Sequence, residues 1–139
     1  MPTPLTIVDA FTSVAFSGNP AAVCVLSEPG DQKWMQNVAS EMNLSETAFL
    51  YPINGESDNQ YNLRWFTPVT EVDLCGHATL ASAHALWEMG AWSGEKGLCF
   101  NTRSGVLRAL FKRGKIQLDF PALEATPLKS PPNFNALLS

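Results

Sequence analysis

The sequence predicts an α+β fold, in which a mixed, strongly curved β-sheet wraps around a central apolar α-helix and one amphipathic helix lies outside. Three observations predict it. Short strand-like segments separated by turn residues occupy most of the chain, and one segment has the periodicity of an amphipathic helix. Residues 76–89 are small or apolar on most sides and carry no charged residue before Glu88. Because a helix without a polar face must be enclosed, the sheet is expected to curl around it.

Turn and breaker residues mark the ends of the strands. Gly18-Asn19-Pro20 separates the first two strands, and the polar segment 54–59 joins the next two as a hairpin. Ser104-Gly105 and Arg113-Gly114 are interpreted as the turns of an antiparallel meander. We expect strands at residues 5–10, 21–26, 47–51, 61–66, 98–102, 106–111 and 115–120.

The outer helix is expected to begin after Asp31, a good N-cap, and to end before Asn43, which tolerates the left-handed conformation of a C-cap. Between them Trp34, Val38 and Met42 recur at helical spacing among polar residues. This spacing predicts that these three side chains form the stripe that packs on the core.

The central helix is expected to begin at Gly76 and to be stopped by Gly90. Since this helix should be enclosed, His84 is interpreted as a core histidine and Trp87 as a packing residue.

Length and composition indicate one globular domain. The chain has 139 residues, of which 45% are hydrophobic and 16% charged, with a net charge of −4. We expect a domain at residues 1–120 and a linker or exit segment at 121–139, where prolines are frequent. The acidic balance argues against a nucleic-acid partner. No segment resembles a signal peptide or a membrane span, so we expect a cytoplasmic protein with no membrane partner.

The three cysteines, Cys24, Cys75 and Cys99, form no CxxC pair, which argues against a disulfide framework or a zinc site. Cys24 and Cys99 lie within strand-like runs and are expected in the core. No metal and no cofactor are predicted.

Glu46 is the first candidate for chemistry. It precedes the apolar run Ala48-Phe49-Leu50. A carboxylate at the mouth of an apolar strand is partly desolvated, which favours a general base. The alternative is an ordinary surface glutamate at a strand start. Arg64, in the middle of a strand, is expected to pair with a buried acid, either Asp9 or Glu71.

The start of the central helix is the second candidate. Backbone N–H groups at Gly76, His77 and Ala78 are free to face an anion there, and His77 is placed to exchange a proton. Alternatively, Asp73 caps the helix and His77 is structural. Cys75 is either a reactive thiol at the helix start or, as we favour, a buried filler.

Five ordered blocks lie between about residue 5 and about residue 120. The blocks are Val8-Asp9-Ala10-Phe11-Thr12, Gly18-Asn19-Pro20-Ala21-Ala22-Val23, Ser45-Glu46-Thr47-Ala48-Phe49, Arg64-Trp65-Phe66-Thr67-Pro68, and Glu71-Val72-Asp73-Leu74-Cys75-Gly76-His77-Ala78-Thr79-Leu80-Ala81. Together they resemble the PhzF-like family of phenazine-biosynthesis isomerases. They argue against an acyl-CoA-binding hot-dog domain.

The resemblance implies a diaminopimelate epimerase-like fold of two similar halves, with this chain as the amino-terminal half. It implies cofactor-free proton transfer on a small amino-acid-like or carboxylate substrate. Glu46 and His77 match the family's catalytic residues. Ser45, Asp73, Gly76, Ala78 and Asn19 are the predicted substrate-binding residues. The remaining alternative is a non-catalytic module that binds a small anion or dimerises. We expect a homodimer or a second similar domain as partner.

Overall fold

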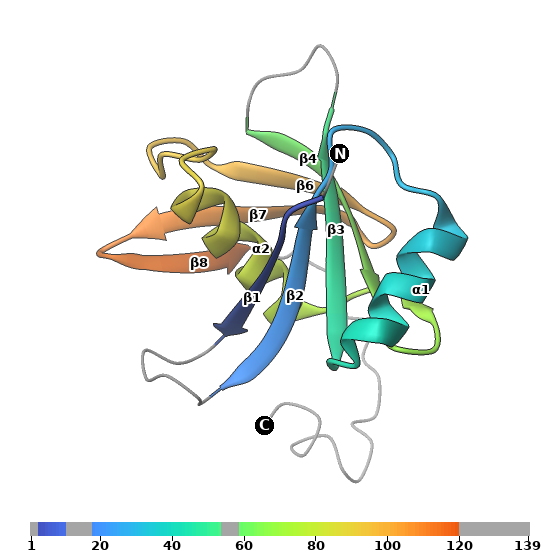
Figure 1. Cartoon of the computed structure of the whole chain (residues 1–139). Coiled ribbons are helices and arrows are strands. Elements are labelled where there is room, and N and C mark those ends of the chain that lie inside the picture. Colours follow the sequence, from blue (N-terminus) through green and yellow to red (C-terminus); the bar gives the residue numbers. More distant parts are fainter. Residues whose placement is uncertain (1–2, 11–17, 54–58, 120–139) are drawn as a thin grey trace, which may run out of the picture.

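The structure is a computed structural model of the chain and describes residues 3–10, 18–53 and 59–119. In this part of the chain, eight strands form one mixed sheet and two helices accompany it (Figure 1). The elements are β1 (Leu5–Ala10), β2 (Asn19–Val25), α1 (Gln32–Met42), β3 (Glu46–Pro52), β4 (Gln60–Phe66), β5 (Glu71–Val72), α2 (Gly76–Glu88), β6 (Leu98–Thr102), β7 (Gly105–Lys112) and β8 (Lys115–Asp119).

The sheet curls because both of its edges close on the same helix. Its strand order is β1-β2-β3-β4-β6-β7-β8, with β5 paired to β4. The central helix α2 packs against β1 and β2 near one edge and against β8 at the other. A flat sheet could not bring both edges to one helix. The predicted curved sheet around a central helix is therefore confirmed.

The two helices lie on opposite faces of the sheet, α2 within the curl and α1 outside it (Figure 1). Each of them also connects a parallel pair of strands, α1 between β2 and β3, and α2 between β4 and β6, because parallel neighbours need a long crossover connection. Alternate residues of β3 face the two helices. Ala48 and Leu50 belong to the core around α2, whereas Phe49 packs with Met35 of α1.

The outer helix begins and ends where the sequence predicts. Asp31 accepts a hydrogen bond from the backbone N–H of Trp34 at 3.0 Å, and Asn43 has a φ of 53°, in the left-handed region. Of the predicted stripe, Val38 packs on the core as expected, but the fully buried positions are the next residues along the helix. Met35 and Ala39 are the buried side chains of α1, while Trp34 is 39% exposed and touches Phe49 only edge-on.

The central helix is enclosed on most sides but not all. Seven of its residues are buried, and the hydroxyls of Thr79 and Ser82 donate to the carbonyls four residues earlier, so burial leaves neither unpaired. His84 is not the predicted core histidine. Its side chain is 38% exposed and lies 3.0 Å from Glu88. Trp87 is 40% exposed and stacks on Phe111.

The remaining differences are small. The described strands agree with the predicted ones to within two residues at each end, and the two-residue strand β5 was not predicted. Cys24 is buried as expected, but Cys99 is only half-buried, which corrects its assignment to the core. Most of the hairpin turn predicted at 54–59 and the segment 121–139 lie outside the described residues, so the domain boundary at 120 stays a prediction. Among the described helices, none has the length and apolar character needed to cross a membrane.

Candidate active site

Glu46 is the first residue of β3, and its side chain points toward α2. It alternates with Ala48 and Leu50, which lie in the core around that helix. In the parallel ladder Glu46 stands beside Ala21 of β2. The left-handed turn at Asn43 ends α1 just before this strand. Glu46 therefore lies at the end of the sheet where β3 begins.

His77 is the second residue of α2 and meets Glu46. Its Nε2 lies 2.9 Å from Oε2 of Glu46, and the two side chains are 15% and 18% exposed. Both atoms are buried, yet neither makes an aligned hydrogen bond with another described residue. The two atoms are therefore in contact without a directional hydrogen bond, and a third group that lies against both of them could bind them.

Cys75 completes a compact group with Glu46 and His77. Its Sγ lies 3.3 Å from Nδ1 of His77. Burial raises the pKa of the Cys75 thiol to about 12, and the charge of Glu46 acts in the same direction, while the backbone N–H of Ala78 partly offsets it. At neutral pH the residue is therefore a protonated thiol. This agrees with the interpretation of Cys75 as a buried residue. Its thiol does not only fill space in an apolar core, however, because it lies beside the polar side chains of Glu46 and His77.

Cys75 is also the N-cap residue of α2, and no side chain caps the helix. This removes the alternative in which Asp73 caps it. The first helical hydrogen bond runs from the N–H of Thr79 to the carbonyl of Cys75 at 3.1 Å. Gly76 is half-buried and Ala78 is fully buried. The first N–H groups of a helix have no intrahelical partner, and those of His77 and Ala78 lie close enough to the Cys75 thiol to lower its pKa.

The other predicted site residues are not part of this group. Ser45 precedes Glu46 and is exposed, and Asn19 is exposed at the start of β2. Asn19 lies two residues before Ala21, the ladder partner of Glu46, so both belong to the same end of the sheet. Asp73 has a 77% exposed side chain that lies 3.4 Å from Arg103.

A network of charges holds the segment that leads into α2. Arg64 donates two hydrogen bonds of 2.7 Å to the carboxylate of Glu71, through Nε and Nη2. Arg103 adds a contact of 3.2 Å to the same carboxylate. The hydrogen bonds from Arg64 lower the pKa of Glu71 and raise that of Arg64. Ser104 donates to the carbonyl of Asp73 at 2.7 Å.

Of the two partners considered for Arg64, the structure selects Glu71. The sequence does not predict the contacts of Arg103 with Glu71 and of Ser104 with Asp73. Arg103 and Ser104 lie in the turn between β6 and β7, about thirty residues further along the chain, and a local sequence pattern does not indicate such a distant contact. The network fixes residues 71–73, and these lead directly to Cys75 and His77.

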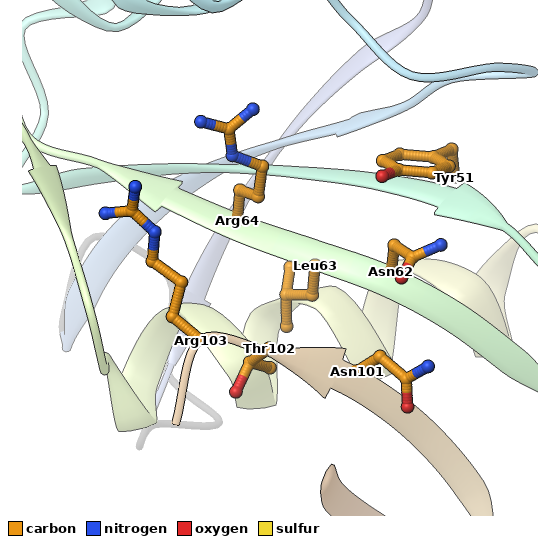
Figure 2. A pocket seen from close by; sticks show the side chains of 7 residues that line it. All are labelled: Tyr51, Asn62, Leu63, Arg64, Asn101, Thr102 and Arg103. Carbon is orange, nitrogen blue, oxygen red and sulfur yellow. The ribbon is translucent and has the colours of Figure 1, made fainter. Parts of the chain in front are cut away.

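A separate hollow of about 330 Å³ opens on the outer face of the sheet (Figure 2). Asn62, Leu63 and Arg64 of β4 all line it. Asn62 and Arg64 alternate with Tyr61 and Leu63, which belong to the core around α2. Figure 2 shows the guanidinium groups of Arg64 and Arg103 at one end and Tyr51, Asn62 and Asn101 at the other. The hollow contains none of Glu46, Cys75 and His77, so it is distinct from the candidate site.

Comparisons with known proteins agree on one family. The family described as "Phenazine biosynthesis-like protein" matches residues 8–136. An "uncharacterized isomerase" of Halalkalibacterium halodurans is 63% identical over 123 residues, 88% of this chain and 44% of that protein. The human "Phenazine biosynthesis-like domain-containing protein" is 49% identical over 131 residues, 91% of this chain and 45% of that protein.

Solved structures agree as well. The Enterococcus faecalis PhzF family protein is 44% identical, with a TM-score of 0.78 over 98% of this chain and 50% of that one. A hydroxyproline epimerase from Agrobacterium vitis, only 15% identical, shares the fold with a TM-score of 0.61 over 84% of this chain and 40% of that one. The chain thus spans about half the length of its relatives. It has the fold of one diaminopimelate epimerase-like half and belongs to the phenazine biosynthesis-like (PhzF) family.

Proposed function

We propose that this chain is the amino-terminal half of an isomerase or epimerase that moves a proton on a small amino-acid-like or carboxylate metabolite without a cofactor. The observation that carries the proposal is the 2.9 Å approach of Glu46 Oε2 to His77 Nε2 at the start of α2. Relatives named as isomerases support the reaction class.

The proposed reaction breaks a C–H bond next to the substrate's carbonyl or carboxylate group. Glu46 accepts the proton through Oε2, and the electron pair moves onto the substrate oxygen. The N–H groups of Gly76 and Ala78 and the imidazole of His77 stabilise the negative charge that develops there, as donors at a helix start do. Return of the proton to another position or face completes an isomerisation.

The surroundings suit this chemistry. The two reacting side chains are mostly buried, so electrostatic interactions between them and a substrate are stronger than in water. Ser45, Asn19 and Asp73 stay predicted substrate contacts. Their exposure means that they would contribute only where a substrate or a partner extends over that end of the sheet.

The partner is proposed to be a second similar domain or a second copy of the chain, because the relatives are about twice as long. Analytical ultracentrifugation of the chain distinguishes these. A concentration-dependent dimer supports self-association. A strict monomer at high concentration supports the requirement for a second domain.

Glu46→Gln tests the chemistry, because it keeps the size of the side chain and removes its basic oxygen. Wild type and variant are incubated in D₂O with a panel of small amino-acid-like carboxylates, as the chain alone and joined to the second half of a relative. Mass spectrometry then measures deuterium incorporation. Exposed Glu28→Gln is the matched control. The proposal is supported if Glu46→Gln loses deuterium incorporation while Glu28→Gln keeps it. It is overturned if Glu46→Gln incorporates as much deuterium as wild type.

The same experiment tests the alternative, a small-anion-binding or dimerising module. The start of α2, where no described side chain caps the backbone N–H groups, is the feature that favours it. Binding of carboxylates with no deuterium incorporation in either form would establish this module and exclude the isomerase.

A further inference from the structure

We propose that Glu46, Cys75 and His77 form a binding site for a zinc-like divalent transition metal ion, and that the ion inhibits the proton transfer proposed above. One potential ligand atom from each residue lies within 4.8 Å of the other two. The inhibitory part rests on the proposed function, whereas the binding part rests on geometry alone.

The three residue types select the kind of ion. Thiolate sulfur, imidazole nitrogen and carboxylate oxygen are the ligands that zinc takes in proteins. The protonated thiol of Cys75 would release its proton to solvent as the ion binds. A soft sulfur ligand disfavours magnesium and calcium, which prefer sets of oxygen atoms. Three protein ligands with a fourth position left for water or a small anion match an open zinc site rather than a closed structural one.

The distances require little movement. Zinc binds nitrogen and oxygen at about 2.0–2.2 Å and sulfur at about 2.3 Å, so two tetrahedral ligands stand roughly 3.2–3.7 Å apart. Oε2 of Glu46 and Nε2 of His77, now 2.9 Å apart, would separate by a few tenths of an ångström. Because one ligand atom from each of the three residues lies within 4.8 Å of the others, the sulfur of Cys75 would approach by at most about one ångström.

A second observation points to a ligand at this place. Oε2 of Glu46 and Nε2 of His77 are both buried and both lack an aligned hydrogen-bond partner among the described residues. Buried polar atoms are normally paired. An ion bound at this place would give both atoms a partner at once.

The scaffold supports a defined site. Cys75 and His77 flank Gly76 at the first turn of α2, and Glu46 begins the adjacent strand β3. Sγ of Cys75 now lies 3.3 Å from Nδ1 of His77, so with Nε2 on the metal the sulfur would leave Nδ1 and turn toward the ion. An ion held there would occupy the oxygen that Glu46 uses to accept a proton, which makes inhibition the expected consequence.

The test uses tag-free, chelator-stripped protein titrated with zinc sulfate by calorimetry, with magnesium chloride in parallel. We expect one zinc per chain and no magnesium binding. Cys75→Ser, His77→Asn and Glu46→Gln should each weaken zinc binding at least about tenfold, since even the loss of a residue that only orients a ligand costs that much. Cys99→Ser and His84→Asn are the matched controls, a half-buried thiol and the other histidine of the chain, and should bind as wild type does.

Cobalt(II) gives a second readout, and its wild-type spectrum does not depend on any variant folding. A sulfur-to-cobalt charge-transfer band in the wild type, absent from Cys75→Ser, identifies the thiolate ligand. Absence of stoichiometric zinc binding, or binding that the two control variants weaken and the three site variants do not, overturns the proposal.

Zinc should also stop deuterium incorporation, and excess chelator should restore it. If no incorporation is found at all, the proposed function fails while the binding result still stands.

Discussion

Replacement of Glu71 by glutamine should destabilise the fold by removing the anion that two arginines share. The carboxylate is 6% exposed and accepts two hydrogen bonds of 2.7 Å from Arg64, with Arg103 at 3.2 Å. Glutamine has the same shape, but its amide presents N–H groups to a guanidinium that can only donate. The substitution therefore leaves Arg64 partly buried without its counter-charge.

The exposure of the partners sets the size of the loss. Removal of one partner from a fully buried pair costs about 3–5 kcal/mol, whereas an exposed pair contributes about 0–1 kcal/mol. Arg64 is 27% exposed and Arg103 is 54% exposed, so the pair lies between these limits. We expect Glu71→Gln to lower the free energy of unfolding by about 2–3 kcal/mol at pH 7.

The pH dependence has a definite sign. Hydrogen bonds from Arg64 hold the pKa of Glu71 below its ordinary value of 4.5. Because the pKa is lower in the folded state, the ionised carboxylate contributes its full stability above about pH 4.5 and loses it as the pH falls through the folded-state pKa. The difference between wild type and variant should therefore shrink toward acid.

Urea unfolding followed by tryptophan fluorescence, in a pH series downward from 7, measures both quantities. Exposed Glu28→Gln is the control and should stay within about 0.5 kcal/mol of wild type. A Glu71 variant as stable as the control at pH 7, or a loss that does not shrink at acid pH, would refute the reasoning.

Two further predictions concern the core and the thiols. Leu86→Ala, at a fully buried position of α2, should cost about 2–5 kcal/mol in urea unfolding, while Met89→Ala, where the side chain is 54% exposed, should change stability by less than about 0.5 kcal/mol. Iodoacetamide at pH 8, followed by mass spectrometry, should label half-buried Cys99 first, because burial raises the pKa of Cys24 to about 11 and that of Cys75 to about 12. Equal labelling of the three would contradict the burial assigned to them.

The helices and strands could be predicted because local sequence signals, such as helix caps, indicate the same elements as the pattern of apolar residues does. Asp31 and Asn43 mark the ends of α1 through chemistry that needs no tertiary context. The absence of charge before Glu88 predicts that α2 is enclosed. The approach of Glu46 to the helix start was expected from its place at an apolar strand and from the family resemblance, and the two side chains do meet.

The errors arise where distant parts of the chain decide. Helical spacing predicts a stripe but not its centre, and packing against Phe49 and Phe66 selects Met35 rather than Trp34. The sequence predicts His84 in the core because it does not show that the sheet leaves one side of α2 uncovered. Glu71 is shared between two arginines because the turn after β6 brings Arg103 to β5. The hydrophobic periodicity of the sequence does not predict this contact.

The account depends on Glu46 and His77 acting as one unit, and a double-mutant cycle measures that directly. The free energies of unfolding of Glu46→Gln, His77→Asn and the double variant are compared with wild type, with exposed Glu28→Gln and His84→Asn as the control pair. For two atoms 2.9 Å apart, the account predicts a coupling energy of about 0.5–3 kcal/mol, of either sign. Effects that add to within about 0.3 kcal/mol, as distant residues do, would contradict it.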